Sequence, residues 1–243
     1  MTELRTKTLA QIVNTNYKTA SVFEKYNLDF CCKGKRTLQE ACGEIKLPVD
    51  QIISELDNIS ITGDIGLDFN KLSLTQLADY IVITHHAYVT QQMPVIFEYL
   101  QKLTFKHGEK HPEIFRIFET FAAVQTEMKL HMEKEEHVFF PGIKKLEQST
   151  TENKQQNTQS FYLNSQIEVL EGEHDHAGSM LAEIRILTNN YTPPADACTT
   201  YRLSFASLQA FETDLHHHVH LENNILFPKA LSLFKKRNEA SLN

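Results

Sequence analysis

Apolar residues recur every three or four positions along most of the chain, and the strict alternation of apolar and polar residues that marks a β-strand is nearly absent. Residues 6–57 contain only short stretches with this helical period. Four longer amphipathic segments follow, at about 72–104, 112–147, 160–190 and 195–236. The pattern predicts an all-α protein with four long helices.

Stretches typical of loops separate the long segments. In chain order they are HGEKHP, EQSTTENKQQNTQS and NNYTPP. Before the first long segment, DNISITGDIGLDFN at residues 57–70 carries two glycines and three aspartates, which is typical of a linker. We therefore expect a small helical domain at 1–57, a linker at 58–70 and an antiparallel four-helix bundle at 71–243.

Residues spaced three and four apart form an apolar seam on each long segment, and this seam should face the centre of the bundle. Each seam is interrupted by one histidine, and the second and fourth seams carry a glutamate four residues after it. The second seam then continues to Val138. The six polar residues on the seams are His86, His131, Glu135, His174, His218 and Glu222.

Two of the seams share a longer motif. HMEKEEHVFFP at 131–141 and HVHLENNILFP at 218–228 both contain H-x-x-x-E, followed by Phe nine and Pro ten residues after the histidine. Histidine and glutamate at i and i+4 lie on one face of a helix, where both can reach one metal centre. The bundle is therefore expected to consist of two related halves.

A single H-x-x-x-E pair on a helix is usually a surface pair worth about a few tenths of a kcal/mol. Six imidazole and carboxylate groups inside one bundle are different, because unpaired they would cost on the order of several kcal/mol. The seam therefore predicts a buried metal site with these six ligands.

The remaining histidines fall off the seams by about 100° or about 200° around their helices, or lie in loops. We expect them at the solvent-exposed surface. They are His85, His107, His111, His137, His176, His216, His217 and His220.

The donor set favours a pair of iron ions. Six ligands are too many for one tetrahedral zinc, and imidazole does not suit magnesium or calcium. Imidazole with carboxylate suits iron, and two carboxylates can each bridge two metal ions. Ferritin-like bundles use Glu-x-x-His on two helices, whereas this chain has the reverse order and more nitrogen than oxygen donors.

Composition narrows the class of protein. The chain has 243 residues, a formal net charge of −7 and a pI near 5.9. It has no basic tract for nucleic acid and no apolar stretch approaching the ~20 residues that span a membrane, and its first residues lack the apolar core of a signal peptide. Four cysteines do not suggest a disulfide framework, so we expect reduced thiols and a cytoplasmic location.

Other residues near these motifs are candidates for supporting roles. Cys31 and Cys32 precede the basic stretch KGKR, which would lower a thiol pKa and favour a redox or metal-handling role, with a structural role as the alternative. Cys42 and Cys198 are expected to be structural. Two carboxylates, Glu127 and Glu173, are candidates to support the ligands or handle protons.

The chain resembles the bacterial di-iron proteins of iron–sulfur cluster repair, the RIC or YtfE/ScdA family. These are hemerythrin-like four-helix bundles preceded by a small cysteine-containing domain. The resemblance covers almost the whole chain and is carried by VFEKYNLDFCCKGKRTLQEAC (22–42), EGEHDHAG (171–178), NNYTPPADACTTY (189–201) and the two H-x-x-x-E motifs.

The resemblance implies that the six seam residues bind two iron ions in an oxo- or hydroxo-bridged centre, with Glu135 and Glu222 as bridges. Two neighbouring histidines are rival candidates, although helix geometry favours His174 and His86. The family usually has no histidine two residues after its ligand on the third helix, so His176 is a rival for His174. His85 is likewise a rival for its neighbour His86.

The resemblance also implies repair of iron–sulfur clusters damaged by nitric oxide or oxidants, by donating iron or removing nitric oxide, and reduction of nitric oxide has been proposed for the family. Damaged iron–sulfur proteins are the expected partners, nitric oxide or oxygen the small ligand, and a second copy of the chain a further candidate. The alternative is a hemerythrin-like sensor or carrier of oxygen or nitric oxide. The amino-terminal cysteine domain favours repair, because a carrier needs no thiol pair.

Overall fold

The computed structural model describes residues 2–61, 67–148 and 156–240, and these residues form helices with no β-strand among them. The all-α prediction is confirmed. None of the described helices is long and apolar enough to cross a membrane.

The amino-terminal part is a group of short helices. They are α1 (Thr2–Thr6), α2 (Leu9–Thr15), the 3₁₀ turn η1 (Tyr17–Thr19), α3 (Ala20–Lys25), α4 (Leu38–Glu44) and α5 (Val49–Ile61). Capping boxes start α2 and α4, since Thr8 and Thr37 each accept a backbone N–H from the third helical residue, whose side chain accepts the N–H of the cap in return. These caps set where such short helices begin.

Helix α5 continues to Ile61, so the prediction that the linker begins at residue 58 is wrong. The apolar period of this helix extends to Ile59, which packs against the core, and the first glycine comes only at Gly63. Residues 62–66 of the predicted linker lie outside the described residues. The 3₁₀ turn η2 (Phe69–Lys71) then leads into the bundle.

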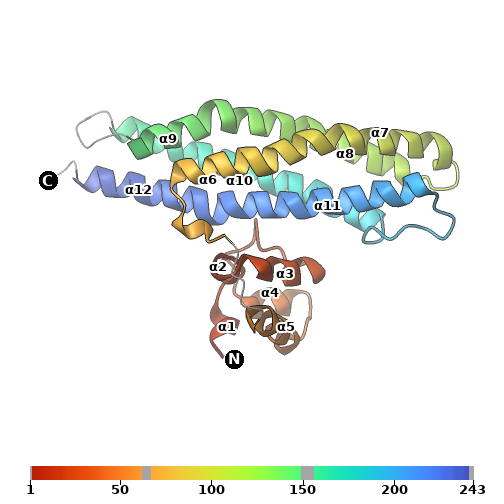
Figure 1. Ribbon diagram of the computed structural model, residues 1–243, viewed down its shortest axis with the longest axis horizontal. Helices are drawn as coiled ribbons and strands as arrows, with labels where there is room; N and C mark the ends of the chain where they lie inside the picture. Colours follow the sequence, from red (N-terminus) through yellow and green to blue (C-terminus); the bar gives the residue numbers. More distant parts are fainter. Residues whose placement is uncertain (1, 62–66, 149–155, 241–243) are drawn as a thin grey trace.

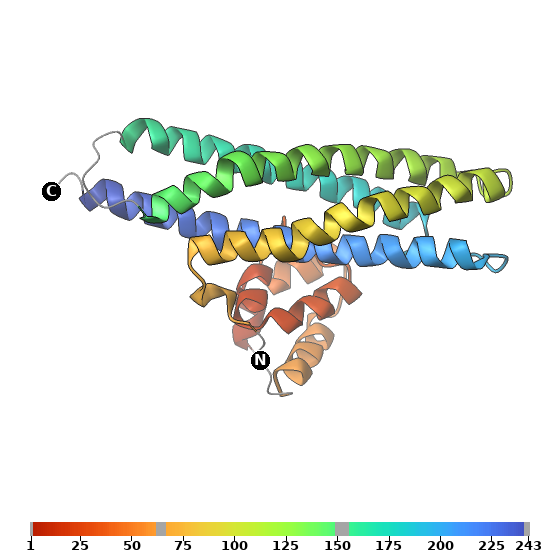
Figure 2. The same ribbon diagram turned by 45° about the horizontal axis from the view of Figure 1, so that its top comes forward.

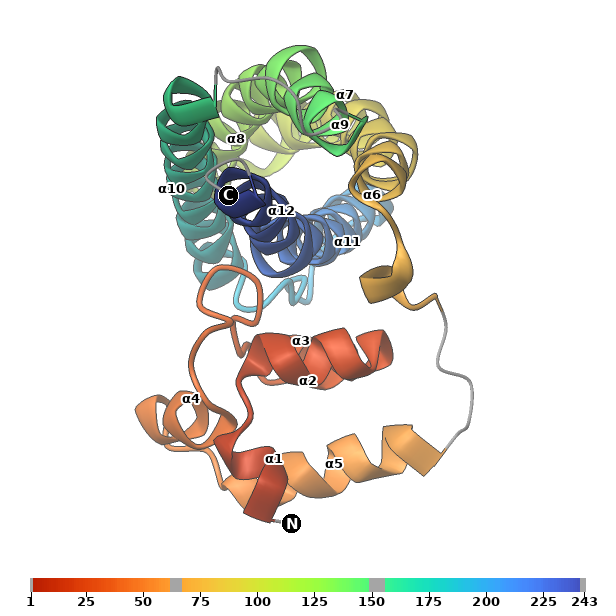
Figure 3. The same ribbon diagram turned by 90° about the vertical axis from the view of Figure 1, so that its left-hand side faces the viewer.

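Elements α6 to α12 form a bundle of four long helices, and Figures 1 and 3 show how these helices pack side by side. The first is α6 (Leu74–Ile81), η3 (Val82–His86) and α7 (Ala87–His107); the second is α8 (Glu113–Lys134), η4 (Glu135–Phe139) and α9 (Phe140–Gln148); the third is α10 (Gln156–Leu187); the fourth is α11 (Thr199–Leu221), η5 (Glu222–Leu226) and α12 (Phe227–Ala240). Neighbours around the bundle are α7 with α8, α8 with α10, α10 with α11, and α11 with α7. The amino-terminal helices lie along one side of the bundle, beside α11 and η5 (Figures 1 and 2).

Three of the four bundle helices contain a five-residue π segment, namely η3, η4 and η5. A π turn holds one residue more than an α turn, so it shifts the residues that follow it around the helix. The predicted seam position Val138 is 46% exposed, whereas its neighbour Phe139 is 2% exposed. The prediction for Val138 is therefore wrong, because the seam assumed an uninterrupted α-helix.

Candidate metal centre

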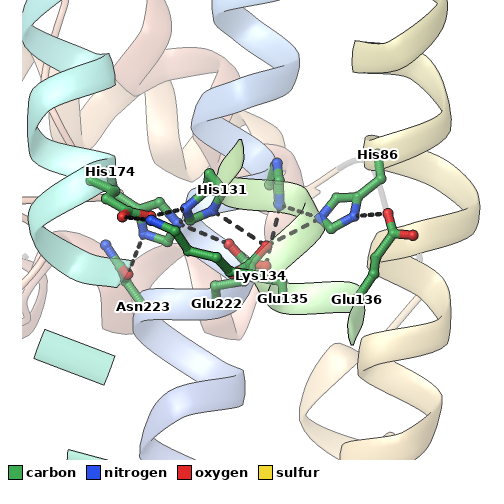
Figure 4. Close-up of polar contacts among 10 residues, drawn as sticks. His86, His131, Lys134, Glu135, Glu136, His174, Glu222 and Asn223 are labelled. Atoms are coloured by element: carbon green, nitrogen blue, oxygen red, sulfur yellow. Dashed lines mark hydrogen bonds and ion pairs between the residues drawn. The ribbon is translucent and has the colours of Figure 1, made fainter. Parts of the chain in front are cut away.

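The six seam residues meet inside the bundle, and Figure 4 labels all of them except His218. None of their side chains is more than 2% exposed. They form two groups of four, and within each group one ligand atom per residue lies within 4.8 Å of all the others. One group contains His86 and His218, the other contains His131 and His174, and Glu135 and Glu222 belong to both.

Local helix geometry places two of the histidine–glutamate pairs. His131 and His218 lie in the last turn of α8 and α11, and each glutamate four residues later opens a π segment. Glu135 Oε2 lies 3.3 Å from His131 Nε2, and Glu222 Oε1 lies 3.2 Å from His218 Nε2. In each pair the histidine and the glutamate therefore lie on the same side of their helix, as residues at i and i+4 should.

Contacts between helices complete the set. Glu135 Oε2 also lies 3.3 Å from His86 Nε2, so this contact joins η4 to η3. Glu222 Oε2 lies 3.2 Å from His174 Nε2 on α10. Each carboxylate therefore faces one histidine of its own helix and one of another.

The outer nitrogens of three imidazoles have hydrogen-bond partners. Nδ1 lies 2.7 Å from Glu136 Oε1 in His86 and 2.9 Å from Glu173 Oε2 in His131. In His174 it lies 2.9 Å from Asn223 Oδ1 (Figure 4). Because these oxygens only accept, each Nδ1 carries the proton and each Nε2 directs its lone pair into the centre.

The inner nitrogens then require a cation. His131 Nε2 and His174 Nε2 are 3.0 Å apart, so two lone pairs would face each other unless a proton or a metal ion lies between them. All four oxygens of Glu135 and Glu222 are buried, and none accepts a hydrogen bond from the described residues. Nitrogen lone pairs and unpaired carboxylate oxygens are a donor set that suits a transition-metal ion.

The charges in the centre also favour the binding of a metal ion. Burial lowers the pKa of His131, but the charge of Glu135 and the contacts with Glu135 and Glu173 outweigh it and raise that pKa to about 10. Burial raises the pKa of Glu222, but the neighbouring imidazoles His218 and His174 bring that pKa well below its ordinary value. The carboxylates therefore stay ionised, and without a metal ion the positive charge that balances them is a proton on an imidazole.

Aromatic rings close the centre from two sides. The rings of Phe140 and His86 stack at 5.7 Å, and those of Phe227 and His174 stack at 6.1 Å. Both phenylalanines are the Phe of the repeated motif and are no more than 2% exposed. The motif therefore supplies ligands and the apolar surroundings that exclude water from them.

His176 is exposed, as predicted from its position on the helix, whereas the supporting role predicted for Glu127 fails. The Nε2 atom of His176 lies 3.3 Å from Glu127 Oε1 at the surface. Glu127 therefore pairs with His176 instead of supporting a ligand, because it points to the outer side of α8. Glu173 does contact His131, whereas the contacts of Glu136 and Asn223 were not predicted. Each of those two residues directly follows a candidate ligand glutamate, and this position in the sequence is the signal that could have identified them.

The prediction that His85 is exposed is also wrong, since it is 4% exposed. Both His85 and His86 lie in η3, where the wider π turn brings two consecutive residues inside. His85 Nδ1 lies 3.0 Å from Asp214 Oδ1, and its ring stacks on that of His218 at 5.7 Å. His85 belongs to neither group of four and packs against His218 of the group that contains His86.

Three more histidines predicted at the surface lie against the amino-terminal helices. The rings of His216, His217 and His220 lie 6.3, 6.1 and 5.4 Å from that of Phe30. His220 is fully buried, with Nε2 2.9 Å from Asn14 Oδ1. Their period on α11 does point away from the bundle, but the amino-terminal domain covers that face.

Cys31 and Cys32 are reduced, with their Sγ atoms 3.8 Å apart. The hydrogen bond with Cys32, burial and the nearby Asp29 raise the pKa of Cys31, so the predicted lowering is wrong for this thiol. Of the basic side chains that follow, Lys35 is 83% exposed and Arg36 pairs with Glu44.

The cysteine pair still has two features of a metal-handling site. Ligand atoms of Asp29, Cys31 and Cys32 lie within 4.8 Å of one another. A cavity of about 430 Å³ is lined by both cysteines and by His174 of the buried centre. Of the other cysteines, Cys42 is buried as expected, whereas Cys198 is exposed, with Sγ 3.3 Å from His107 Nε2.

Comparisons with known proteins agree with this arrangement. Residues 77–230 match the Hemerythrin HHE cation binding domain, and residues 5–60 match ScdA_N, described as a domain of unknown function (DUF542). The chain is 33% identical to the iron–sulfur cluster repair protein YtfE of Musicola paradisiaca, over 93% of this chain and 97% of the relative. YtfE proteins of Yersinia pestis and an Enterobacter species are 32% and 33% identical, each over 94% of this chain and 98% of the relative. The buried histidine–glutamate groups thus lie in a domain matched to cation binding.

Proposed function

The chain belongs to the family of YtfE-type iron–sulfur cluster repair proteins, and we propose that it repairs clusters damaged by nitrosative or oxidative stress through a di-iron centre. Damaged iron–sulfur proteins are its proposed clients, and nitric oxide or oxygen is the proposed small ligand. The bundle provides the iron centre and the amino-terminal domain provides the thiols.

The observation that best supports a di-iron centre is that two groups of four ligands share two carboxylates. Each group supplies two imidazoles and two carboxylates to one metal position. Sharing allows Glu135 and Glu222 to bridge two ions, which suits a pair of irons better than one tetrahedral zinc. When bound, such a pair supplies redox chemistry and open positions for a small ligand.

The residues around the ligands have defined tasks. Glu136, Glu173 and Asn223 hold three imidazoles in the tautomer that directs Nε2 inward. The two stacked phenylalanines keep bulk water away. The cluster is therefore preorganised for metal by contacts outside the ligand set.

Cys31 and Cys32 are proposed to accept iron or nitrosyl from the buried centre or to pass iron on to a client. The cavity that both cysteines line together with His174 supports this role, because it places the two sites beside the same cavity. Asp29 adds a carboxylate to the two thiols, so the loop offers three donors for a transiently held ion.

Full-length protein with Cys31→Ala and Cys32→Ala tests this division of work. Iron content is expected to match that of the wild type, because neither residue contacts the buried ligands, while reactivation of an iron–sulfur enzyme damaged by nitric oxide is expected to fall strongly. Cys198→Ala is the matched control and should repair normally. Normal repair by the double variant would make the cysteines structural, and no repair by the wild type would favour an oxygen or nitric oxide carrier.

A further inference from the structure

The loop that carries the cysteines, residues 29–34, closes around the side-chain amide of Asn224. Nδ2 of Asn224 donates to the carbonyl oxygen of Cys31 at 2.9 Å and to that of Phe30 at 3.4 Å. On the other side, a Cβ atom added to Gly34 would lie 3.1 Å from Oδ1 of Asn224. Both ends of the amide therefore touch this cysteine loop.

The backbone of Asn224 is held as well. Nδ2 of Asn14, on α2, donates to its carbonyl oxygen at 3.2 Å. The Asn14 side chain also contacts Nε2 of His220 at 2.9 Å, one turn earlier on the fourth bundle helix. Asn224 is thus one of the residues through which the amino-terminal domain contacts this helix.

Asn224 lies in η5, two residues after Glu222. If this π segment became α-helical, the residues after the extra one would turn by about 100° and move by about 1.5 Å along the axis. Asn224 could then no longer meet the cysteine loop in its present position. Glu222 is the first residue of the same segment, so the candidate metal ligand and Asn224 lie within one π turn. One helical segment therefore positions a candidate metal ligand and the residue that holds the cysteine loop.

We propose that Asn224 is a positioning residue that couples the metal centre to the cysteine loop. Metal binding by Glu222 stabilises the π register of η5, and this register keeps Asn224 inside the loop that carries Cys31 and Cys32. The inference rests on the metal centre proposed above and goes beyond it by making the state of the thiols depend on metal occupancy. Coupling of this kind is reciprocal, so alkylating the cysteines must also change the affinity for metal.

The chain contains its own controls for a thiol-labelling test. Full-length protein, iron-loaded or stripped by dialysis against a chelator, is treated with iodoacetamide, and labelling is followed for each cysteine by peptide mass spectrometry. We expect Cys31 and Cys32 to react about fivefold or more slowly in the loaded protein. Exposed Cys198 should react equally in both states, and buried Cys42 should react in neither.

Variants of Asn224 and of a control residue distinguish this coupling from a general loosening of the structure around the cysteines. Asn224→Ala should retain iron but label at the stripped rate even when loaded, and Asn224→Asp, which keeps the shape and loses the donor, should behave the same way. Glu24→Gln is the matched control, because Glu24 contacts His216 at 2.8 Å across the same interface but outside η5. It should keep the dependence on iron.

The outcomes decide between the two proposals. Iron-dependent labelling that persists in both Asn224 variants would overturn the coupling, as would iron-loaded wild-type protein that labels like stripped protein. A parallel rise in Cys42 labelling would assign the effect to unfolding and overturn it too. Wild-type protein that binds no iron would instead refute the proposed metal centre, which elemental analysis shows before any labelling is done.

Discussion

Replacing a shared carboxylate should cost more metal than replacing a histidine. His86 belongs to one group of four, whereas Glu222 belongs to both. His86→Gln therefore removes one ligand from one metal position and leaves the other intact. Glu222→Gln removes a charged ligand from both positions while nearly keeping the shape of the side chain.

The size of the effect follows from the number of ligands. Four-ligand zinc sites bind with about 10–16 kcal/mol, so each ligand is worth about 3–4 kcal/mol, or about two to three orders of magnitude in affinity. At a chelator concentration at which the wild type keeps about two irons per chain, His86→Gln should keep about one. Glu222→Gln should keep almost none.

Elemental analysis of full-length protein after equilibration with the chelator measures this directly. His137→Gln and His176→Gln are matched controls, because each lies two residues after a candidate ligand and is exposed. Both should retain the wild-type metal content. Equal losses in His86→Gln and Glu222→Gln, or a wild type with one zinc and no iron, would refute two positions that share carboxylates.

Two further predictions concern residues outside the ligand set. Glu136→Gln should weaken iron binding about 10–100-fold, because it removes the carboxylate that faces Nδ1 of His86, and competition with a chelator measures this change. Glu147 accepts the backbone N–H groups of Leu74 and Thr75 at the start of α6, at 2.8 and 3.0 Å. Burial raises the pKa of Glu147, but hydrogen bonds with the side chain and backbone of Thr75 and with the backbone of Leu74 outweigh it and bring that pKa below its usual 4.5. The ionised carboxylate therefore stabilises the fold above about pH 4.5, and this contribution is lost as the pH falls through the lowered pKa. Urea unfolding should show Glu147→Gln to be about 1 kcal/mol less stable at pH 7, with the difference vanishing in acid, and a difference that persists in acid would contradict this assignment.

The sequence alone determined the helices and the six residues that meet in the bundle. Residues at i, i+3 and i+4 share a helix face whatever surrounds the helix, so a histidine on an apolar seam could be assigned to the interior. His131 with Glu135, and His218 with Glu222, needed no knowledge of the fold. The helix ends were also close to those predicted, since caps and loop residues act locally.

Only the tertiary structure decided what depends on residues far apart in the chain. The π segments shift the register by one residue, which exposes Val138 and buries His85, and the seam carried no sign of them. The outer face of α11 looks like a surface from its own period, yet His220 is buried there by the amino-terminal domain. Periodicity reports which residues share a face, but which element covers that face is set by contacts between helices distant in sequence, and these contacts also direct Asn224 to the cysteine loop.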